Sequence, residues 1–145
     1  MLTTIQIMEI LKEVAWFQGV YPIDSLPITL SRKKAIIINL DESYKEGSHW
    51  VALYLDDKGI AHYFDSFGRR PQGLILTFIE RVSNYLMFNL KKYQGNISTA
   101  CGYFCILFVI SAHDNINHFY KLFRECEHIV NETKLFMILQ QYLIN

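Results

Sequence analysis

Short apolar runs alternate with polar stretches along the chain, and their spacing predicts an order of helices and strands. Residues 4–15 carry an apolar side chain every three or four positions, which is typical of a short helix. An isoleucine-rich run over residues 35–40 predicts a buried strand. Aromatic and β-branched residues dominate 49–55 and 60–64, and the sequence Asp-Asp-Lys-Gly at 56–59 between them favours a hairpin turn.

The second half of the chain is mostly helical by the same criteria. We expect a helix over residues 72–87, a strand over 88–93 and two closing helices over 115–126 and 128–143. Residues 101–112 are apolar on nearly all sides, a pattern that indicates a helix buried in the middle of a domain.

These elements give the order α, β, β, β, α, β, α, α, α and predict an α+β fold. We expect a small, mainly antiparallel sheet packed on the central helix 101–112. Glycine and proline residues between 19 and 27 predict a loop, and a polar, turn-rich stretch covers residues 43–48. No repeat, low-complexity tract or linker divides the chain, so we expect a single domain over residues 1–145.

Composition and charge narrow the class of protein. Of 145 residues, 51% are hydrophobic and 14% aromatic, which is enough for a packed core and too much for disorder. The formal net charge is +0, so nothing favours electrostatic capture of nucleic acid. No apolar run reaches the length of a membrane span, and no secretory leader is evident. An odd set of three cysteines does not indicate a disulfide framework, and a reducing intracellular compartment is expected.

The candidate chemistry rests on four residues in the order His49, Asp65, Gln94 and Cys101. These are the parts of a thiol protease: a base, an orienter for the base, an oxyanion donor and a nucleophile. Cys101 begins the apolar helix, where the positive end of the helix dipole favours a thiolate. The alternative is a buried structural cysteine, which is what we expect of Cys105 one turn later. No residue pattern calls for a cofactor or a metal.

The predicted hairpin gives His49 and Asp65 a geometric link. The start of one strand lies beside the end of the next, so the two side chains are expected to be neighbours across the sheet. A surface histidine and a turn-capping aspartate are the alternatives for these two residues taken singly. Gln94 alone is an ordinary loop glutamine, but it can donate to an oxyanion beside the Cys101 N–H.

The order and spacing of these motifs resemble the adenovirus-type (adenain-like) cysteine protease family, closest to the proteases of Polinton/Maverick-type elements and related DNA viruses. The likeness covers roughly residues 16 to 110 and includes the interval of seven from Gln94 to Cys101. SUMO-specific proteases of the same wider clan share the His-Trp, Asp and Gln…Cys-Gly elements. The segments that carry the likeness are Ala35–Asn39, Gly47–Ala52, Tyr63–Gly68 and Gln94–Cys105.

The resemblance implies a papain-like fold and assigns His49 as general base, Asp65 as its orienter, Cys101 as nucleophile and Gln94 as oxyanion donor. It also implies an endopeptidase that cleaves after Gly-Gly or Gly-x-Gly motifs in capsid precursors during virion maturation. Alternatives are a protease acting on the Gly-Gly tails of ubiquitin or SUMO, a clan-related acetyltransferase, and a non-catalytic helical adaptor.

Substrate contacts are expected from three further residues. Trp50 and Trp16 are expected to shape a narrow slot that admits glycine, and Gly102 lets the backbone come close to the substrate. The alternative is that both tryptophans are ordinary core residues. Substrate protein is the expected partner, and the chain is expected to act as a monomer in the host cell and the virion.

Activation is expected to differ from that of adenoviral relatives, which carry glutamate in place of Asp65 and tether an activating peptide through a cysteine. This chain has no cysteine upstream of Gln94, and its basic residues look scattered along the sequence. We therefore predict weak DNA affinity at physiological salt and basal activity without an activator.

Overall fold

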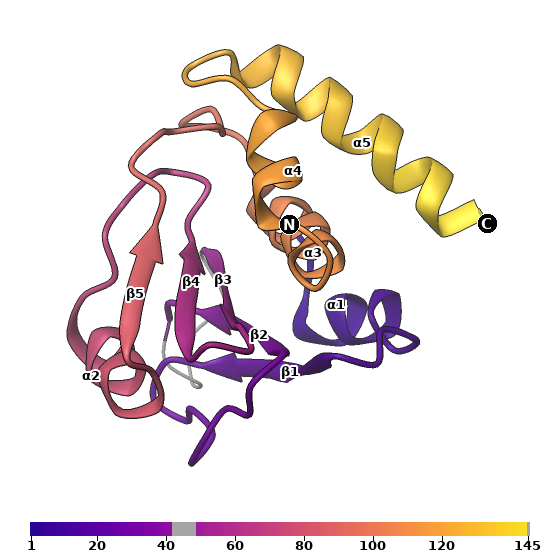
Figure 1. Cartoon of the computed structure of the whole chain (residues 1–145). Helices are drawn as coiled ribbons and strands as arrows, with labels where there is room; N and C mark the ends of the chain where they lie inside the picture. The colour runs from indigo at the N-terminus through magenta and orange to yellow at the C-terminus, as the bar shows by residue number, and fades with distance from the viewer. Residues whose placement is uncertain (42–48, 145) are drawn as a thin grey trace.

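The computed structural model describes residues 1–41 and 49–144. A five-stranded sheet with the order β1-β2-β3-β4-β5 forms its centre (Figure 1). The strands are β1 (Phe17–Pro22), β2 (Lys34–Asn39), β3 (Trp50–Leu55), β4 (Ile60–Phe64) and β5 (Tyr85–Phe88). The turn predicted over residues 43–48 lies outside the described residues.

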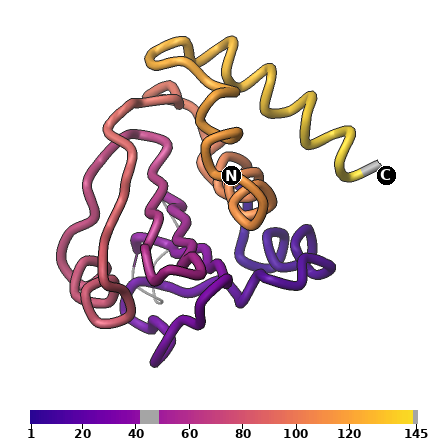
Figure 2. Tube along the Cα trace, in the orientation of Figure 1, coloured from indigo at the N-terminus to yellow at the C-terminus, as the bar shows by residue number. Residues whose placement is uncertain are grey.

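Helices cover both faces of the sheet (Figures 1 and 2). The helices are α1 (Thr4–Ile10), α2 (Gly73–Val82), α3 (Cys101–Ala112), α4 (Ile116–Lys121) and α5 (His128–Ile144). One face of the sheet packs on α3, with α1, α4 and α5 around it, and the other face packs on α2. The expected α+β class, with a small sheet on a central buried helix, is therefore confirmed.

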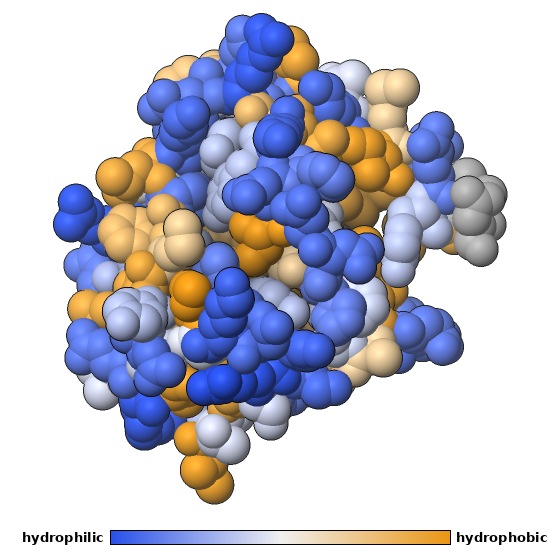
Figure 3. All heavy atoms as spheres, viewed as in Figure 1, coloured by the Kyte–Doolittle hydropathy of each residue, from blue (hydrophilic) through white to orange (hydrophobic). Residues whose placement is uncertain are grey.

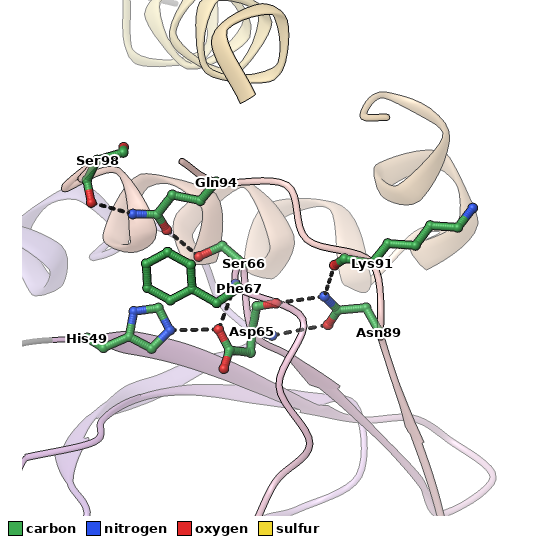
Figure 4. A network of polar contacts seen from close by, with 8 residues as sticks. All are labelled: His49, Asp65, Ser66, Phe67, Asn89, Lys91, Gln94 and Ser98. Atoms are coloured by element: carbon green, nitrogen blue, oxygen red, sulfur yellow. Dashed lines mark hydrogen bonds and ion pairs between the residues drawn. The ribbon is translucent and has the colours of Figure 1, made fainter. Parts of the chain in front are cut away.

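Strand pairing explains why the central strands of the sheet could be predicted from the sequence. β2, β3 and β4 pair antiparallel, and most of their residues are buried because each of their faces meets a helix layer. The two edge strands, β1 and β5, pair parallel to their neighbours, so the sheet is mixed and not mainly antiparallel as expected. Parallel pairing places the ends of β4 and β5 at the same end of the sheet, and the loops that follow them run side by side (Figures 1 and 4).

Several predicted boundaries are wrong, and the helix expected over residues 4–15 already ends at Ile10. The loop predicted from residue 19 contains most of β1, which reaches Pro22 because an edge strand tolerates glycine and proline. The helix predicted over 72–87 ends at Val82, and the strand predicted over 88–93 lies earlier, at Tyr85–Phe88. The helix predicted over 115–126 ends at Lys121, so Cys126 lies in a loop with a left-handed φ of 62°.

The surface is mixed in character. Hydrophilic side chains cover most of the face seen in Figure 3, and the apolar patches on it are separated by polar residues. Within residues 1–41 and 49–144, no helix combines the length and apolar character needed to cross a membrane.

Candidate active site

His49 and Asp65 lie against one another at one end of the sheet, as the hairpin predicted. His49 directly precedes β3 and Asp65 directly follows β4, its antiparallel partner. The His49 Nε2 lies 2.6 Å from Asp65 Oδ1, and both side chains are buried (Figure 4). A carboxylate accepts only, so this contact assigns the proton to Nε2 and leaves the Nδ1 lone pair open in the neutral ring.

The Asp65 carboxylate is fixed by its own turn. The same Oδ1 accepts from the Phe67 N–H at 2.8 Å, and the Asp65 carbonyl accepts from the Gly68 N–H at 2.8 Å. Both predicted alternatives for Asp65 therefore hold, because its carboxylate caps the turn and also contacts the imidazole of His49. A side chain that caps its own turn cannot rotate freely, so the turn also orients the carboxylate toward His49.

Asn89 fixes the Asp65 backbone from the neighbouring strand. Its Oδ1 accepts from the Asp65 N–H at 3.1 Å, and its Nδ2 donates to the Asp65 carbonyl at 2.6 Å and to the Lys91 carbonyl at 3.1 Å (Figure 4). The side-chain amide therefore continues the β4–β5 ladder by one residue where the two strands diverge. Nothing in the sequence singled out Asn89, because an isolated asparagine after a short strand carries no signal.

The environment of His49 favours the protonated ring. Burial by itself lowers the His49 pKa, but hydrogen bonding and charge from Asp65, together with the nearby Cys101, outweigh burial and raise the pKa to about 9. The Phe67 ring stacks on the imidazole, with centroids 4.7 Å apart. The His49 Nδ1 is buried and has no hydrogen-bond partner among the described residues. Since Cys101 interacts with this ring and Nε2 is occupied by Asp65, Nδ1 is the atom left for the thiol.

Cys101 begins α3, as predicted, and is only 1% exposed. The N-cap residue Ala100 makes no side-chain cap hydrogen bond, and the first turn of α3 contains no acidic residue. The positive end of the helix dipole therefore lies at Cys101 without local compensation. Cys105 is fully buried in the core, and burial raises the pKa of its thiol well above the usual range.

Gln94 is buried and held by hydrogen bonds at both ends of its amide (Figure 4). The Ser66 hydroxyl donates to Gln94 Oε1, and Gln94 Nε2 donates to the Ser98 carbonyl at 2.7 Å. An amide nitrogen carries two hydrogens, so one stays available. Ser66 directly follows Asp65, so a single turn positions both the orienter of His49 and the amide of Gln94.

Gly102 and Trp50 form a tight contact beside the nucleophile. A Cβ on Gly102 would lie 3.1 Å from Leu2 Cδ1 and 3.3 Å from Trp50 Cδ1, so no larger residue fits without displacement. The Trp50 indole N–H donates to the Leu2 carbonyl at 3.0 Å, and Trp50 is 1% exposed. In this structure Trp50 therefore supports the Cys101 end of α3 from beneath and does not present a free surface.

The expected slot of two tryptophans is not formed: Trp50 lies beside Cys101 but is buried, and Trp16 lies away from the site. Its indole N–H donates to the Val109 carbonyl at 2.7 Å, and its ring stacks on His113, with centroids 4.4 Å apart. Val109 lies about 12 Å along α3 from Cys101, at 1.5 Å per residue. The expectation that Trp16 lines a slot at the nucleophile is thus corrected: it anchors β1 to the far end of α3.

The fold and the site together define a cysteine-protease-like architecture: a buried His–Asp pair at the end of a sheet, facing a cysteine at the start of a central helix. No known family model matches the chain. Comparison with curated proteins finds a SUMO-1 cysteine protease, S273R, of African swine fever virus, which is 27% identical over 96 residues. A protein of Acanthamoeba polyphaga mimivirus that carries the name thiol protease R355 is 31% identical over 87 residues.

These matches cover 57% and 52% of this chain but only 34% and 28% of the relatives, so the chain spans about a third of their length. The crystal structure of the African swine fever virus pS273R protease shares the fold, with a TM-score of 0.64 at 17% identity over 93% of this chain and 66% of that one. Its selenomethionine form gives 0.50 at 24% identity, over 70% and 43%. The relatives carry the names of viral cysteine or thiol proteases, one of them a SUMO-1 cysteine protease, whereas the narrower adenovirus-type or Polinton/Maverick assignment stays a prediction.

Proposed function

We propose that this chain is a cysteine endopeptidase in which His49, Asp65, Gln94 and Cys101 carry the reaction. The observation that carries the proposal is the His49 ring. One of its nitrogens is held by a buried carboxylate, and the other is buried and unpaired among the described residues, next to a cysteine at a helix N-terminus. A buried nitrogen that lacks a hydrogen-bond partner destabilises the fold. Here the free nitrogen can take the proton of a nucleophilic thiol, which gives it a catalytic role.

The reaction follows from the assignment of protons. His49 takes the Cys101 proton on Nδ1, and the thiolate attacks the scissile carbonyl carbon to form a tetrahedral oxyanion. The free N–H of Gln94 and the Cys101 backbone N–H donate to that oxygen. His49 then gives its proton to the leaving amine as the C–N bond breaks, which leaves a thioester. A water molecule, deprotonated by His49, hydrolyses the thioester and returns the thiol.

Crowding around the nucleophile supports glycine next to the scissile bond. Cys101 and Trp50 are each 1% exposed, and Gly102 already lies in close contact with Trp50 and Leu2. A substrate residue with a side chain must displace some of these groups, whereas glycine needs the least room. We therefore propose cleavage after Gly-Gly or Gly-x-Gly motifs in capsid precursors, in the infected cell and the virion.

The name of the African swine fever virus relatives favours a second candidate, a protease that acts on the tail of a ubiquitin-like protein. Both candidates need the same chemistry and differ in how the substrate docks.

A peptide library tests the proposal directly. Purified chain is incubated with peptides that contain Gly-Gly, Gly-x-Gly or matched alanine sequences, and the products are identified by mass spectrometry. We expect cleavage at glycine motifs that is lost in Cys101→Ala. Absence of cleavage together with acetyl transfer from a thioester donor would overturn the proposal. Co-expression with a capsid precursor or with a ubiquitin-like precursor distinguishes the two candidates by which one is processed.

A further inference from the structure

The tertiary structure gathers two pairs of basic residues that look unrelated in the sequence. Arg69 and Arg70 follow Gly68 in the loop after β4, and Lys91 and Lys92 lie in the loop after β5. The two loops are in direct contact, because a Cβ on Gly68 would lie 2.7 Å from the Leu90 carbonyl oxygen and 2.8 Å from that of Lys91. We call the set Arg69, Arg70, Lys91 and Lys92 the basic rim.

The basic rim lies beside the proposed catalytic base. Arg69 Cζ is 5.0 Å and Lys92 Nζ is 5.4 Å from the centroid of the Phe67 ring, and that ring stacks on His49 at 4.7 Å. The two cationic groups are therefore within about 10 Å of the imidazole, which is about three residues of extended chain. Any polypeptide that places its scissile bond at Cys101 and His49 passes within reach of the rim.

The rim is not neutralised by ion pairs of the described residues, although Glu125 and Glu127 lie near it, because they flank Cys126, whose N–H donates to the Lys92 carbonyl at 2.9 Å. None of the four side chains forms an ion pair among the described residues, whose ion pairs are Lys12–Glu9, His49–Asp65 and His62–Asp56. Arg69, Arg70 and Lys91 are exposed, and the Lys91 side chain extends away from Asn89 and Asp65 (Figure 4). The rim thus gathers four of the 14 Lys and Arg residues of the chain at one corner, more positive charges than the two glutamates beside it.

We propose that the basic rim binds acidic side chains of the substrate and makes the chain select glycine motifs flanked by Asp or Glu. This inference rests on the proposed function and narrows its substrate class. Carboxylates within about three to five residues of the scissile bond are close enough to pair with guanidinium and ammonium groups at the rim. DNA is the less suitable occupant, because four charges at one corner of a neutral protein supply few phosphate contacts and weak affinity at physiological salt.

Peptides of matched sequence test the proposal. Glu, Gln or Lys is placed three to five residues before or after one Gly-Gly motif, and kcat/KM is measured at low and at high salt. We expect the Glu-flanked peptide to be cleaved on the order of tenfold faster than the Lys-flanked one at low salt, the scale of two exposed ion pairs. The ratio should shrink at high salt, because exposed charges are screened.

Two double variants change the net charge of the protein by the same amount and distinguish the effect of the rim from the effect of total charge. Arg70→Glu/Lys91→Glu should abolish or reverse the preference for Glu. Lys33→Glu/Lys58→Glu should keep it, because these residues lie at the opposite end of the sheet, where the Lys33 N–H donates to the Leu55 carbonyl and Lys58 lies in the β3–β4 turn. An equal rate for all peptides in the parent, or an equal loss of preference in both double variants, would overturn the proposal.

Binding to the inactive Cys101→Ala variant gives a readout that does not need catalysis. Fluorescence anisotropy with labelled peptides should rank Glu above Gln above Lys, and the Arg70→Glu/Lys91→Glu changes should remove this order. If no peptide is cleaved but the order holds, the proposed function fails and the acidic docking site stands. If a labelled DNA duplex binds in a rim-dependent way at physiological salt while the peptides bind equally, the rim is a nucleic-acid site and the proposal is wrong.

Discussion

Replacing Asp65 by asparagine tests the electrostatic design of the site. The His49 pKa of about 9, against an ordinary value of 6.5, corresponds to roughly 3 kcal/mol of net favourable interaction with the protonated ring, at about 1.4 kcal/mol per pKa unit. The carboxylate supplies hydrogen bonding and charge, whereas burial opposes protonation. The Asp65→Asn change removes the charge but leaves the burial, so the His49 pKa should fall well below 9.

The expected result is a slower enzyme with a shifted pH profile. The His49 ring of the parent should stay protonated until the pH passes about 9, and kcat/KM should decline above it. In Asp65→Asn the alkaline decline should move to lower pH, and the rate should fall by about 10–10³-fold because the ring loses orientation and charge support. His49→Ala should lower the rate further. The assay is kcat/KM for a Gly-Gly peptide from about pH 5 to about pH 10.

Stability provides an independent check of the same reasoning. A histidine whose folded pKa is raised contributes stability that is fully present below pH 6.5 and is lost as the pH rises through about 9. The melting temperature of Asp65→Asn should therefore lie furthest below that of the parent under mildly acidic conditions, and the gap should narrow toward pH 9 and above. Asp56→Asn is the matched control, because it breaks the second His–Asp pair, His62–Asp56 at 2.8 Å, away from the nucleophile. An Asp65→Asn profile that coincides with those of the parent and of this control would refute the assignment of Asp65 as orienter.

Further predictions concern the cysteines, the amide and the hairpin turn. Cys101→Ala should abolish turnover, whereas Cys105→Ser should not. One equivalent of a thiol reagent at neutral pH should label Cys101. Mass spectrometry that finds Cys126 or Cys105 labelled, with activity intact, would contradict the assignment of Cys101 as nucleophile. Gln94→Ala should lower kcat by about 10²–10³-fold with little change in KM, because an oxyanion exists only in the transition state; a pure KM effect reassigns the residue to substrate binding. Cys126→Ser and added duplex DNA should both leave basal activity unchanged, and an enzyme that is inert until DNA is supplied would show a different mode of activation. Asp56→Ala should lower the free energy of unfolding by about 1–3 kcal/mol in denaturant titrations. The Asp56 carboxylate accepts from two backbone N–H groups of the turn and contacts His62. An unchanged denaturation midpoint would show that the turn forms without this carboxylate.

The sequence by itself determined the elements that local pattern controls. The apolar run of α3 and the aromatic and β-branched runs of β3 and β4 on either side of a short turn needed no distant partner, so their positions could be predicted closely. The hairpin then dictated that His49 and Asp65 meet, because antiparallel strands joined by a tight turn place these two ends together. Helix geometry likewise placed Cys101 at the positive end of a dipole.

Tertiary structure decided what depends on partners far away in the chain. β1 is a strand because the parallel strand β2 supplies its hydrogen bonds, although Gly19 and Pro22 predict a loop. Trp16 faces the far end of α3 because the path of the chain from β1 takes it there. Parallel pairing of β5 with β4 is what brings Asn89 to the Asp65 backbone and the two basic pairs to one rim. Periodicity records which face of an element is buried, but only packing fixes which distant element covers that face.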